Sequence, residues 1–462
     1  MAGPVAAGAD EFAAKLASFV KENRIYGAAA GVVHGDELAW SGGAGFADAR
    51  TARRSSPDTL YRIASITKTF TGTAIMQLRD ARKLDLDDPV VKWIPELAGS
   101  ASPATISGVT IRRVLSHESG LVSEPPGTDW SLLQPVYEGL ADRNLARVAE
   151  IFTAVPPNTQ WKYSNLGYQL LGEIVRRISD QPYPEYLRQH VLDPLGMTAT
   201  SFEPLSEDLA GRSATGYNGR AFSDELDVAP HMSPIWSEGG LWSSVQDLAR
   251  WASFQLGPYA EPATQSPVLA SATLREMHKP RYLVDEEWTQ ASAISWYAVR
   301  KDDVIWTQHS GGLPGFVTNF CFNSKSRVAG IALLNGEADA SQLAMELAQI
   351  GARLVQACPP EIKVPAPMPE QYKPLLGLYA SPEMSALMRV EWRDGKLQFV
   401  DPTAPTWRPE LEPTDNPDQF KVGPGYRPSG EIARFHMLAS GVVETLFVGG
   451  GTFVKLNPPE RR

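Results

Sequence analysis

The runs of residues that are typical of β-strands lie near the two ends of the first 356 residues, and a long stretch of helical patterns separates them. Two such runs, 28–34 and 37–41, are joined by Gly35-Asp36, a dipeptide that favours a hairpin turn. Three more follow far downstream, at 303–308, 316–322 and 327–334. If the two groups pair, the chain between them must leave the sheet and return to it. We therefore expect an antiparallel sheet that carries an inserted, mainly helical subdomain.

Helical patterns at the two ends of this region are expected to flank the sheet. Asp10 can cap a helix whose apolar residues recur at helical spacing, and a second helical pattern runs from 340 to 354. The sequence thus predicts an α+β domain over residues 1–357, with the helical subdomain at roughly 75–300. We expect a cleft where the subdomain meets the sheet, since pockets favour such junctions.

The pattern of the chain changes at residues 358–370, which contain five prolines and have the composition of a linker. Beyond them, the sequence alternates between short apolar runs and turns, including the hairpin signal Asp394-Gly395. This pattern of seven or eight short strands predicts a second domain at 371–462, a small all-β barrel of the up-and-down type.

Composition excludes several classes of function. There are 53 acidic and 43 basic residues, a net charge of −10, which argues against a nucleic-acid-binding protein. Two cysteines are too few for a disulfide framework or a zinc site, and no apolar run is long enough to span a membrane. We expect neither a metal nor a cofactor. The N-terminus has no pattern of a signal peptide, which favours the cytoplasm, or the periplasm or secretion if a leader has been removed.

The first candidate catalytic motif is Ser65-Ile66-Thr67-Lys68, followed by a helical pattern to about Asp80. If Ser65 opens that helix, Lys68 projects from the same face one turn later. The helix N-terminus and burial both disfavour a charged lysine, so Lys68 can act as a neutral base for a serine nucleophile. By itself Ser-x-x-Lys is also compatible with a capping serine and a solvated lysine.

The second motif is Tyr163-Ser164-Asn165, placed before a helical pattern at 167–178. In an extended turn, residues two apart point the same way, so the phenol and the amide can face one cleft. A phenolate can accept a proton if a lysine lowers the pKa of the tyrosine, and Asn165 can orient a substrate carbonyl. A tyrosine packed in a loop is the alternative.

The third motif is the glycine-rich run that begins at His309 and continues as Ser310-Gly311-Gly312, between two strand patterns. Glycines allow a substrate to approach the backbone, and the N–H groups of Gly312 and Ser65 are candidate oxyanion donors. His309 is a candidate hydrogen-bond donor or proton relay, and a structural histidine in a hairpin is the alternative.

Taken together, Ser65-x-x-Lys68, Tyr163-x-Asn165 and His309-x-Gly311 resemble the motifs of the class C β-lactamase-like serine hydrolases. This family includes family VIII esterases, D-alanyl-D-alanine carboxypeptidases and D-aminopeptidases. The resemblance covers residues 10–356 and extends to two further segments, 114–121 and 239–249. It implies that Ser65 is acylated, that Lys68 and Tyr163 share the acid and base roles, and that Asn165 holds the substrate. The C-terminal barrel resembles the lipocalin-like domain appended to some members.

The chain departs from the β-lactamase pattern at His309-Ser310-Gly311, where those enzymes carry Lys-Thr-Gly. A neutral histidine binds a substrate carboxylate poorly, so we expect a carboxylesterase on small esters. A D-amino-acid peptidase or amidase and a weak β-lactamase remain alternatives. So does a ligand-binding protein without turnover, because fold does not imply function. A homo-oligomer is left open.

Trp236 and His117 lie outside these three motifs. Trp236 lies in a Pro- and Gly-containing stretch and is a candidate lining residue of the acyl pocket. His117-Glu118 begins like a zinc-protease motif, but Leu121 stands where the second histidine is required. We therefore interpret His117 as a structural residue of a loop.

Overall fold

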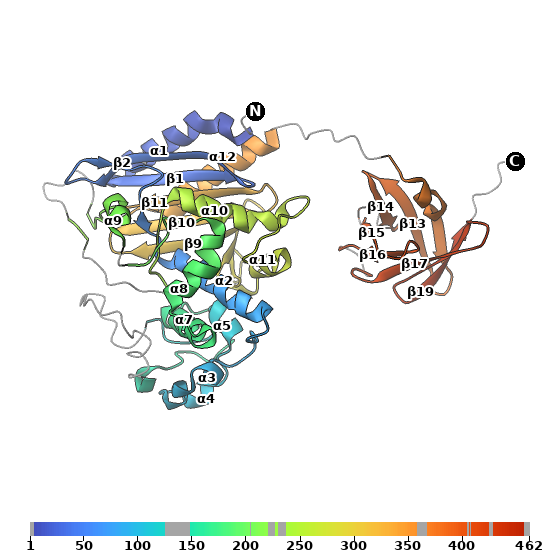
Figure 1. The fold of residues 1–462 in the computed structure, drawn as a ribbon, viewed down its shortest axis with the longest axis horizontal. Helices are drawn as coiled ribbons and strands as arrows, with labels where there is room; N and C mark the ends of the chain where they lie inside the picture. Colours follow the sequence, from blue (N-terminus) through green and yellow to red (C-terminus); the bar gives the residue numbers. More distant parts are fainter. Residues whose placement is uncertain are drawn as a thin grey trace. The chain divides into compact units, whose positions relative to one another are not determined.

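The computed structural model describes most of the chain, and it divides into two units, Met1–Pro359 and Pro360–Arg462 (Figure 1). The described residues are 4–124, 148–203, 205–219, 227–229, 237–357, 367–403, 406, 408–424 and 428–456. Most of the expected linker at 358–370 lies outside these ranges. The two units are described separately below.

The first unit is built on an antiparallel sheet that, within the described ranges, has nine strands in the order β3-β2-β1-β11-β10-β9-β8-β7-β6. The strands are β1 (Gly27–His34), β2 (Glu37–Asp48), β3 (Arg53–Arg54), β6 (Tyr282–Leu283), β7 (Gln290–Ser292), β8 (Tyr297–Lys301), β9 (Val304–Leu313), β10 (Phe316–Asn323) and β11 (Val328–Leu334). The central pair joins the two ends of the unit, with Ala28 opposite Leu334. The expected sheet, formed from both ends of the region, is confirmed.

The two faces of this sheet are covered by different parts of the chain. Alternate residues of β1 point to opposite faces. Ala30 and Val32 belong to the core shared with α1 (Ala9–Asn23) and α12 (Ala340–Ala357). Ala29 and Val33 belong to the larger core on the other face. The terminal helices thus cover one face, and the inserted helices cover the other (Figure 1).

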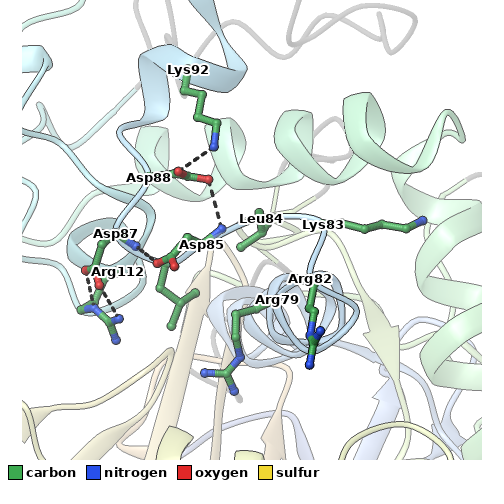
Figure 2. A pocket seen from close by; sticks show the side chains of 10 residues that line it. Arg79, Arg82, Lys83, Leu84, Asp85, Asp87, Asp88, Lys92 and Arg112 are labelled. Atoms are coloured by element: carbon green, nitrogen blue, oxygen red, sulfur yellow. Dashed lines mark hydrogen bonds and ion pairs between the residues drawn. The ribbon is translucent and has the colours of Figure 1, made fainter.

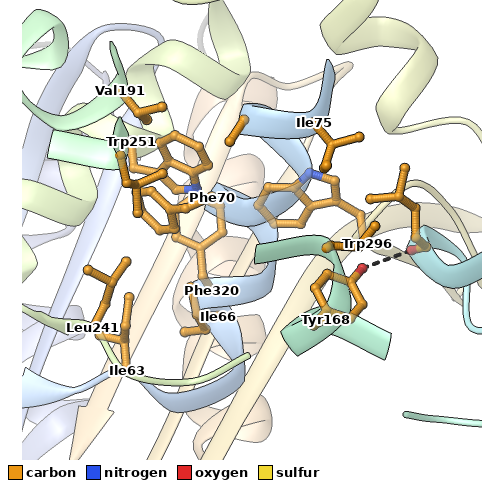
Figure 3. Packing of buried hydrophobic residues seen from close by; sticks show 14 of the residues in the cluster. Ile63, Ile66, Phe70, Ile75, Tyr168, Val191, Leu241, Trp251, Trp296 and Phe320 are labelled. Atoms are coloured by element: carbon orange, nitrogen blue, oxygen red, sulfur yellow. Dashed lines mark hydrogen bonds between the residues drawn. The ribbon is translucent and has the colours of Figure 1, made fainter. Parts of the chain in front are cut away.

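The inserted subdomain surrounds α2 (Thr67–Asp80), a helix that is buried along almost its whole length. Phe70 of α2 stacks on Trp251 with ring centroids 3.8 Å apart (Figure 3). The other helices are α3 (Val90–Trp93), α4 (Pro103–Ile106), α5 (Ile111–Leu115), α7 (Asn165–Ser179), α8 (Tyr183–Leu187), α9 (Glu207–Arg212), α10 (Val245–Leu256) and α11 (Ser271–Met277). A central helix packed on every side is a rigid support for the residues at its N-terminal end.

The second unit is an eight-stranded sheet, within the described residues, in the order β14-β13-β12-β19-β18-β17-β16-β15. Its strands are β12 (Gly377–Ser381), β13 (Ala386–Arg393), β14 (Lys396–Val400), β15 (Leu411–Pro413), β16 (Gln419–Val422), β17 (Ile432–Met437), β18 (Val443–Val448) and β19 (Gly451–Leu456). A bridge between Gln398 and Glu410 joins the two edges, so the sheet is an almost closed barrel around its own apolar core. The predicted all-β barrel is confirmed, whereas its likeness to lipocalins stays a prediction. Across the described part of the chain, no helix has the length and apolar character needed to cross a membrane.

Candidate active site

Ser65 lies in a single 3-10 turn, η2 (Ala64–Ile66), which leads directly into α2. The residue before it, Ala64, has a φ of +48°, a conformation that non-glycine residues rarely adopt. Such backbone strain persists only where the surroundings impose it, and it is concentrated at functional sites. The turn therefore holds Ser65 in a defined position at the start of the central helix.

Strand β9 lies against this turn because it carries a glycine at the point of contact. A Cβ atom added to Gly311 would lie 2.2 Å from the carbonyl oxygen of Ile63 and 2.6 Å from the hydroxyl oxygen of Thr318. A Cβ atom added to Gly312 would meet nothing within 4 Å. Gly311 is thus required for close packing, whereas Gly312 faces open space beside the serine turn.

Lys68 is fully buried one turn after Ser65, with 0% of its surface exposed. Its three ammonium donors all have acceptors. The Nζ atom lies 3.1 Å from Ser65 Oγ, 2.7 Å from Asn165 Oδ1 and 2.6 Å from the carbonyl oxygen of Glu238. Three acceptors on three different segments fix the amine next to the serine hydroxyl.

Asn165 at the start of α7 contacts this amine, and Tyr163 just before it contacts the serine. Ser164 caps this helix, because its side chain accepts the N–H of Gly167. The backbone of Ser164 is extended, so the side chains of the residues before and after it both point toward Ser65 and Lys68. Tyr163 donates its hydroxyl to Ser65 Oγ at 2.8 Å, and the Lys68 ammonium lies 5.0 Å from the centroid of the phenol ring. The structure thus brings four sequence-predicted residues into one hydrogen-bonded group.

His309 is buried beside this group, with 2% of its surface exposed. Its Nδ1–H donates to the carbonyl oxygen of Ser310 at 2.7 Å, so Nε2 carries a lone pair. Nε2 has no hydrogen-bond partner among the described residues. Burial, together with the charge of Lys68, lowers the pKa of His309 to about 3. The imidazole is therefore neutral at any physiological pH.

Two acidic residues that sequence reasoning missed approach Lys68 from different sides. Glu124 Oε1 accepts the amide of Asn165 at 2.7 Å, whereas Oε2 is buried without a hydrogen-bond partner among the described residues. Glu238 is buried, and its carboxylate accepts a hydrogen bond from Gln169. Burial raises the pKa of both carboxyl groups. No local sequence signal marked either residue, because the role of each depends on its position beside Lys68 or Asn165 in the folded structure.

One predicted lining residue, Trp236, lies outside the described residues, and nothing is concluded about it. Within the described ranges, no group of three His, Cys, Asp or Glu side chains is arranged to hold a metal ion.

A hollow of about 540 Å³ lies at the opposite end of α2 from Ser65 (Figure 2). It is lined mainly by charged side chains, four of which form two ion pairs. Arg112 bonds Asp87 at 2.7 Å and 2.8 Å, and Lys92 bonds Asp88 at 2.7 Å. A helix of this length separates its two ends by about 20 Å, so the hollow is distinct from the group around Ser65.

Residues 12–352 match the family model described as Beta-lactamase. The chain belongs to the β-lactamase family. Members of this family are serine hydrolases, and the match covers the whole group of residues around Ser65.

The chain is also similar to individual proteins and solved structures. Protein flp of Staphylococcus aureus is 27% identical over 328 residues, which are 68% of this chain and 61% of that protein. The chain thus spans about three fifths of the length of this relative. An octameric penicillin-binding protein homologue from Pyrococcus abyssi has a similar structure, with a TM-score of 0.64 and 21% identity over 96% of this chain and 99% of that one. A D-stereospecific amidohydrolase from Streptomyces has a TM-score of 0.58 and 23% identity over 73% of this chain and 98% of that one. At these identities, the two structures show the fold alone.

Proposed function

We propose that this chain hydrolyses small carboxylic esters through an acyl-enzyme formed on Ser65. The observation that carries the proposal is the pair of contacts on the serine oxygen. Lys68 Nζ lies 3.1 Å from it and the hydroxyl of Tyr163 lies 2.8 Å from it. A serine hydroxyl is a weak nucleophile, and an adjacent group that accepts its proton activates it.

In this mechanism, Ser65 Oγ forms a bond to the ester carbonyl carbon, and its proton passes to the pair of Lys68 and Tyr163. One member of the pair must be deprotonated beforehand to accept it. The backbone N–H groups of Ser65 and Gly312 are the proposed donors to the oxyanion. The proton then passes to the departing alkoxide as the C–O bond breaks. Water then attacks the carbonyl carbon of the acyl-serine and loses its proton to the pair. As the bond between this carbon and Ser65 Oγ breaks, the pair returns the proton to Oγ, and the carboxylic acid leaves.

The preference for esters over β-lactams rests on His309. A neutral imidazole offers no charge to a substrate carboxylate, and the pKa of His309 of about 3 keeps it neutral. Charge-assisted hydrogen bonds are roughly twice as strong as neutral ones. Weak β-lactamase activity is therefore the less favoured alternative.

A second candidate function, a D-amino-acid peptidase or amidase, is favoured by Glu124. Its Oε2 atom is buried, lacks a hydrogen-bond partner among the described residues, and belongs to a carboxylate that also contacts Asn165. A buried acceptor without a partner costs free energy, and a substrate ammonium could satisfy it. The site around Ser65 would then accept aminoacyl esters and amides.

The deciding experiment is the hydrolysis of p-nitrophenyl butyrate by the wild type and by Ser65→Ala. We expect turnover in the wild type and none in the variant. Equal turnover in both proteins would overturn the assignment of the nucleophile. If neither protein hydrolyses the ester, labelling of Ser65 by a fluorophosphonate separates a strict peptidase from a binding protein, because labelling needs an activated serine.

We also propose that the chain assembles into a homo-oligomer. Support comes from the Pyrococcus abyssi homologue, which is described as octameric. Light scattering coupled to size-exclusion chromatography tests this, and a monomer at micromolar concentration would contradict it.

A further inference from the structure

His117 contacts three consecutive residues of the segment that carries Tyr163. Its carbonyl oxygen accepts the N–H of Lys162 at 2.8 Å, and its Nδ1 atom accepts the N–H of Ser164 at 3.2 Å. Between these two bonds, the imidazole stacks on the phenol ring of Tyr163, with centroids 4.3 Å apart and an interplanar angle of 29°. One residue therefore holds the backbone on both sides of Tyr163 and also the ring itself.

The protonation of this imidazole follows from its partners. A backbone N–H can only donate, so Nδ1 must carry a lone pair and Nε2 the proton. Burial, followed by the charge of Lys68, holds the pKa of His117 well below its usual value, so the ring stays neutral. Protonation of Nδ1 would remove the acceptor for Ser164. The residue also has a φ of +59°, which shows that its surroundings impose an unusual backbone conformation.

We propose that His117 is a positioning residue that holds the phenol of Tyr163 within hydrogen-bond distance of Ser65. This inference rests on the proposed function and adds a residue to which no catalytic role is assigned. His117 makes no hydrogen bond to Ser65 or Lys68 within the described structure; it acts through Tyr163. The 2.8 Å distance between the Tyr163 hydroxyl and Ser65 Oγ depends on where the ring lies. A misplacement of about 1 Å in such a group can slow the reaction about 100-fold.

Two substitutions separate the contacts that His117 makes. His117→Asn keeps an acceptor close to the position of Nδ1 and tolerates a positive φ, but it loses the stacked ring. His117→Leu, of similar volume to histidine, loses both the acceptor and the ring. We expect the acylation rate constant at saturating p-nitrophenyl butyrate to fall about 10-fold in the asparagine variant and about 100-fold in the leucine variant. The half-saturating ester concentration should stay within about threefold in both, since His117 acts on the chemical step.

His278→Asn is the matched control. His278 is likewise a buried histidine with two hydrogen bonds, to Tyr259 and Gln255, but it does not contact Tyr163. Its variant should be less stable and yet acylate at close to the wild-type rate. Equal slowing of His278→Asn and His117→Asn would overturn the inference, because the effect would then follow from the loss of any buried histidine.

The acylation rate of each variant is measured by stopped flow, and its folding by circular dichroism. Ser65→Ala is measured in the same way as the inactive reference. A folded His117→Leu variant that acylates at the wild-type rate, beside an inactive Ser65→Ala, overturns only the role of His117. Turnover in Ser65→Ala overturns the proposed function itself. If His117→Leu does not fold, His117→Asn decides: a 10-fold slower acylation supports the inference, and an unchanged rate contradicts it.

Discussion

The hydroxyl of Tyr163 lies 2.8 Å from Ser65 Oγ, although 98 residues separate the two in the sequence. The serine comes from a turn before the central helix α2, and the tyrosine from the extended segment before α7. Lys68 completes the group from within α2, fully buried and bound to three acceptors. This arrangement predicts how substitutions should change the reaction rate and the stability, and how stability should depend on pH.

Removing the phenolic hydroxyl should slow acylation without unfolding the protein. Tyr163→Phe keeps the ring that stacks on His117 and loses only the bond to Ser65. General acid–base groups contribute about 100- to 10,000-fold to a rate, so kcat for p-nitrophenyl butyrate should fall within that range. Thermal unfolding should stay near that of the wild type. A kcat within threefold of the wild type would exclude Tyr163 from proton transfer.

The adjacent residues Gly311 and Gly312 should respond differently to substitution by alanine. Gly311→Ala places a Cβ atom 2.2 Å from a backbone oxygen of Ile63, so β9 or the serine turn must move. We expect a loss of stability of about 1–3 kcal/mol, as for other overpacked sites, together with lower activity. Gly312→Ala meets open space and should keep wild-type stability. Urea unfolding measures the free energy of unfolding of the two variants. Equal losses of stability would show that the close contact at Gly311 does not prevent a side chain there.

Substituting Glu124 should lower the preference for substrates that carry an amine, and it should leave the hydrolysis of other esters nearly unchanged. Glu124→Gln keeps an acceptor for Asn165 and removes the negative charge. The matched substrates are the p-nitrophenyl esters of D-alanine and of propionic acid, which differ only in the amine. A hydrogen bond to a charged group contributes about 1.5–3 kcal/mol, so the preference for the amine should fall roughly 10- to 100-fold.

The propionyl ester is the internal control for this substitution, and its kcat/KM should change less than about threefold in Glu124→Gln. An equal fall for both esters would assign Glu124 to the support of Asn165 alone. A wild type without any preference for the amine would remove the second candidate function.

Acid should destabilise the protein through its buried histidines. Burial lowers the pKa of His278 and of His309 from the ordinary 6.5 to about 3. Between these values the unfolded chain binds more protons than the native state, so the free energy of unfolding falls as the pH falls. Each histidine contributes about 1.4 kcal/mol per pH unit. Urea unfolding from pH 7.5 to 5 measures the slope, and His278→Asn should reduce it; parallel slopes in the two proteins would refute the assignment.

The barrel should fold without the first unit. Its apolar core, which includes Tyr379, Phe399 and Phe435, is formed by its own strands. Residues 367–462 expressed alone should therefore give a β-sheet circular dichroism spectrum and a cooperative melt. The complementary fragment, truncated after Val364, should retain ester hydrolysis, since the group around Ser65 lies in the first unit. An altered substrate preference in that fragment would contradict this independence of the first unit.

The fold could be predicted in outline because patterns of apolar residues are local and periodic. The paired ends of the sheet and the all-β tail were both expected from such patterns, and both were found. The up-and-down order of the strands in the barrel was expected as well. The register of these strands and the bridge between Gln398 and Glu410 could not be predicted, because strand pairing depends on contacts between distant residues.

The sequence by itself determined the types of residue available for chemistry at Ser65, Lys68 and Tyr163, since motif spacing fixes which side chains share a helix face or a turn. Only the tertiary structure decided their environment. The neutral state of His309, the Glu124 oxygen that has no partner among the described residues, and the three contacts of His117 arise from burial and from neighbours far away in the chain. Desolvation and hydrogen-bond completion depend on everything packed around a group, and no local spacing of residues contains that information.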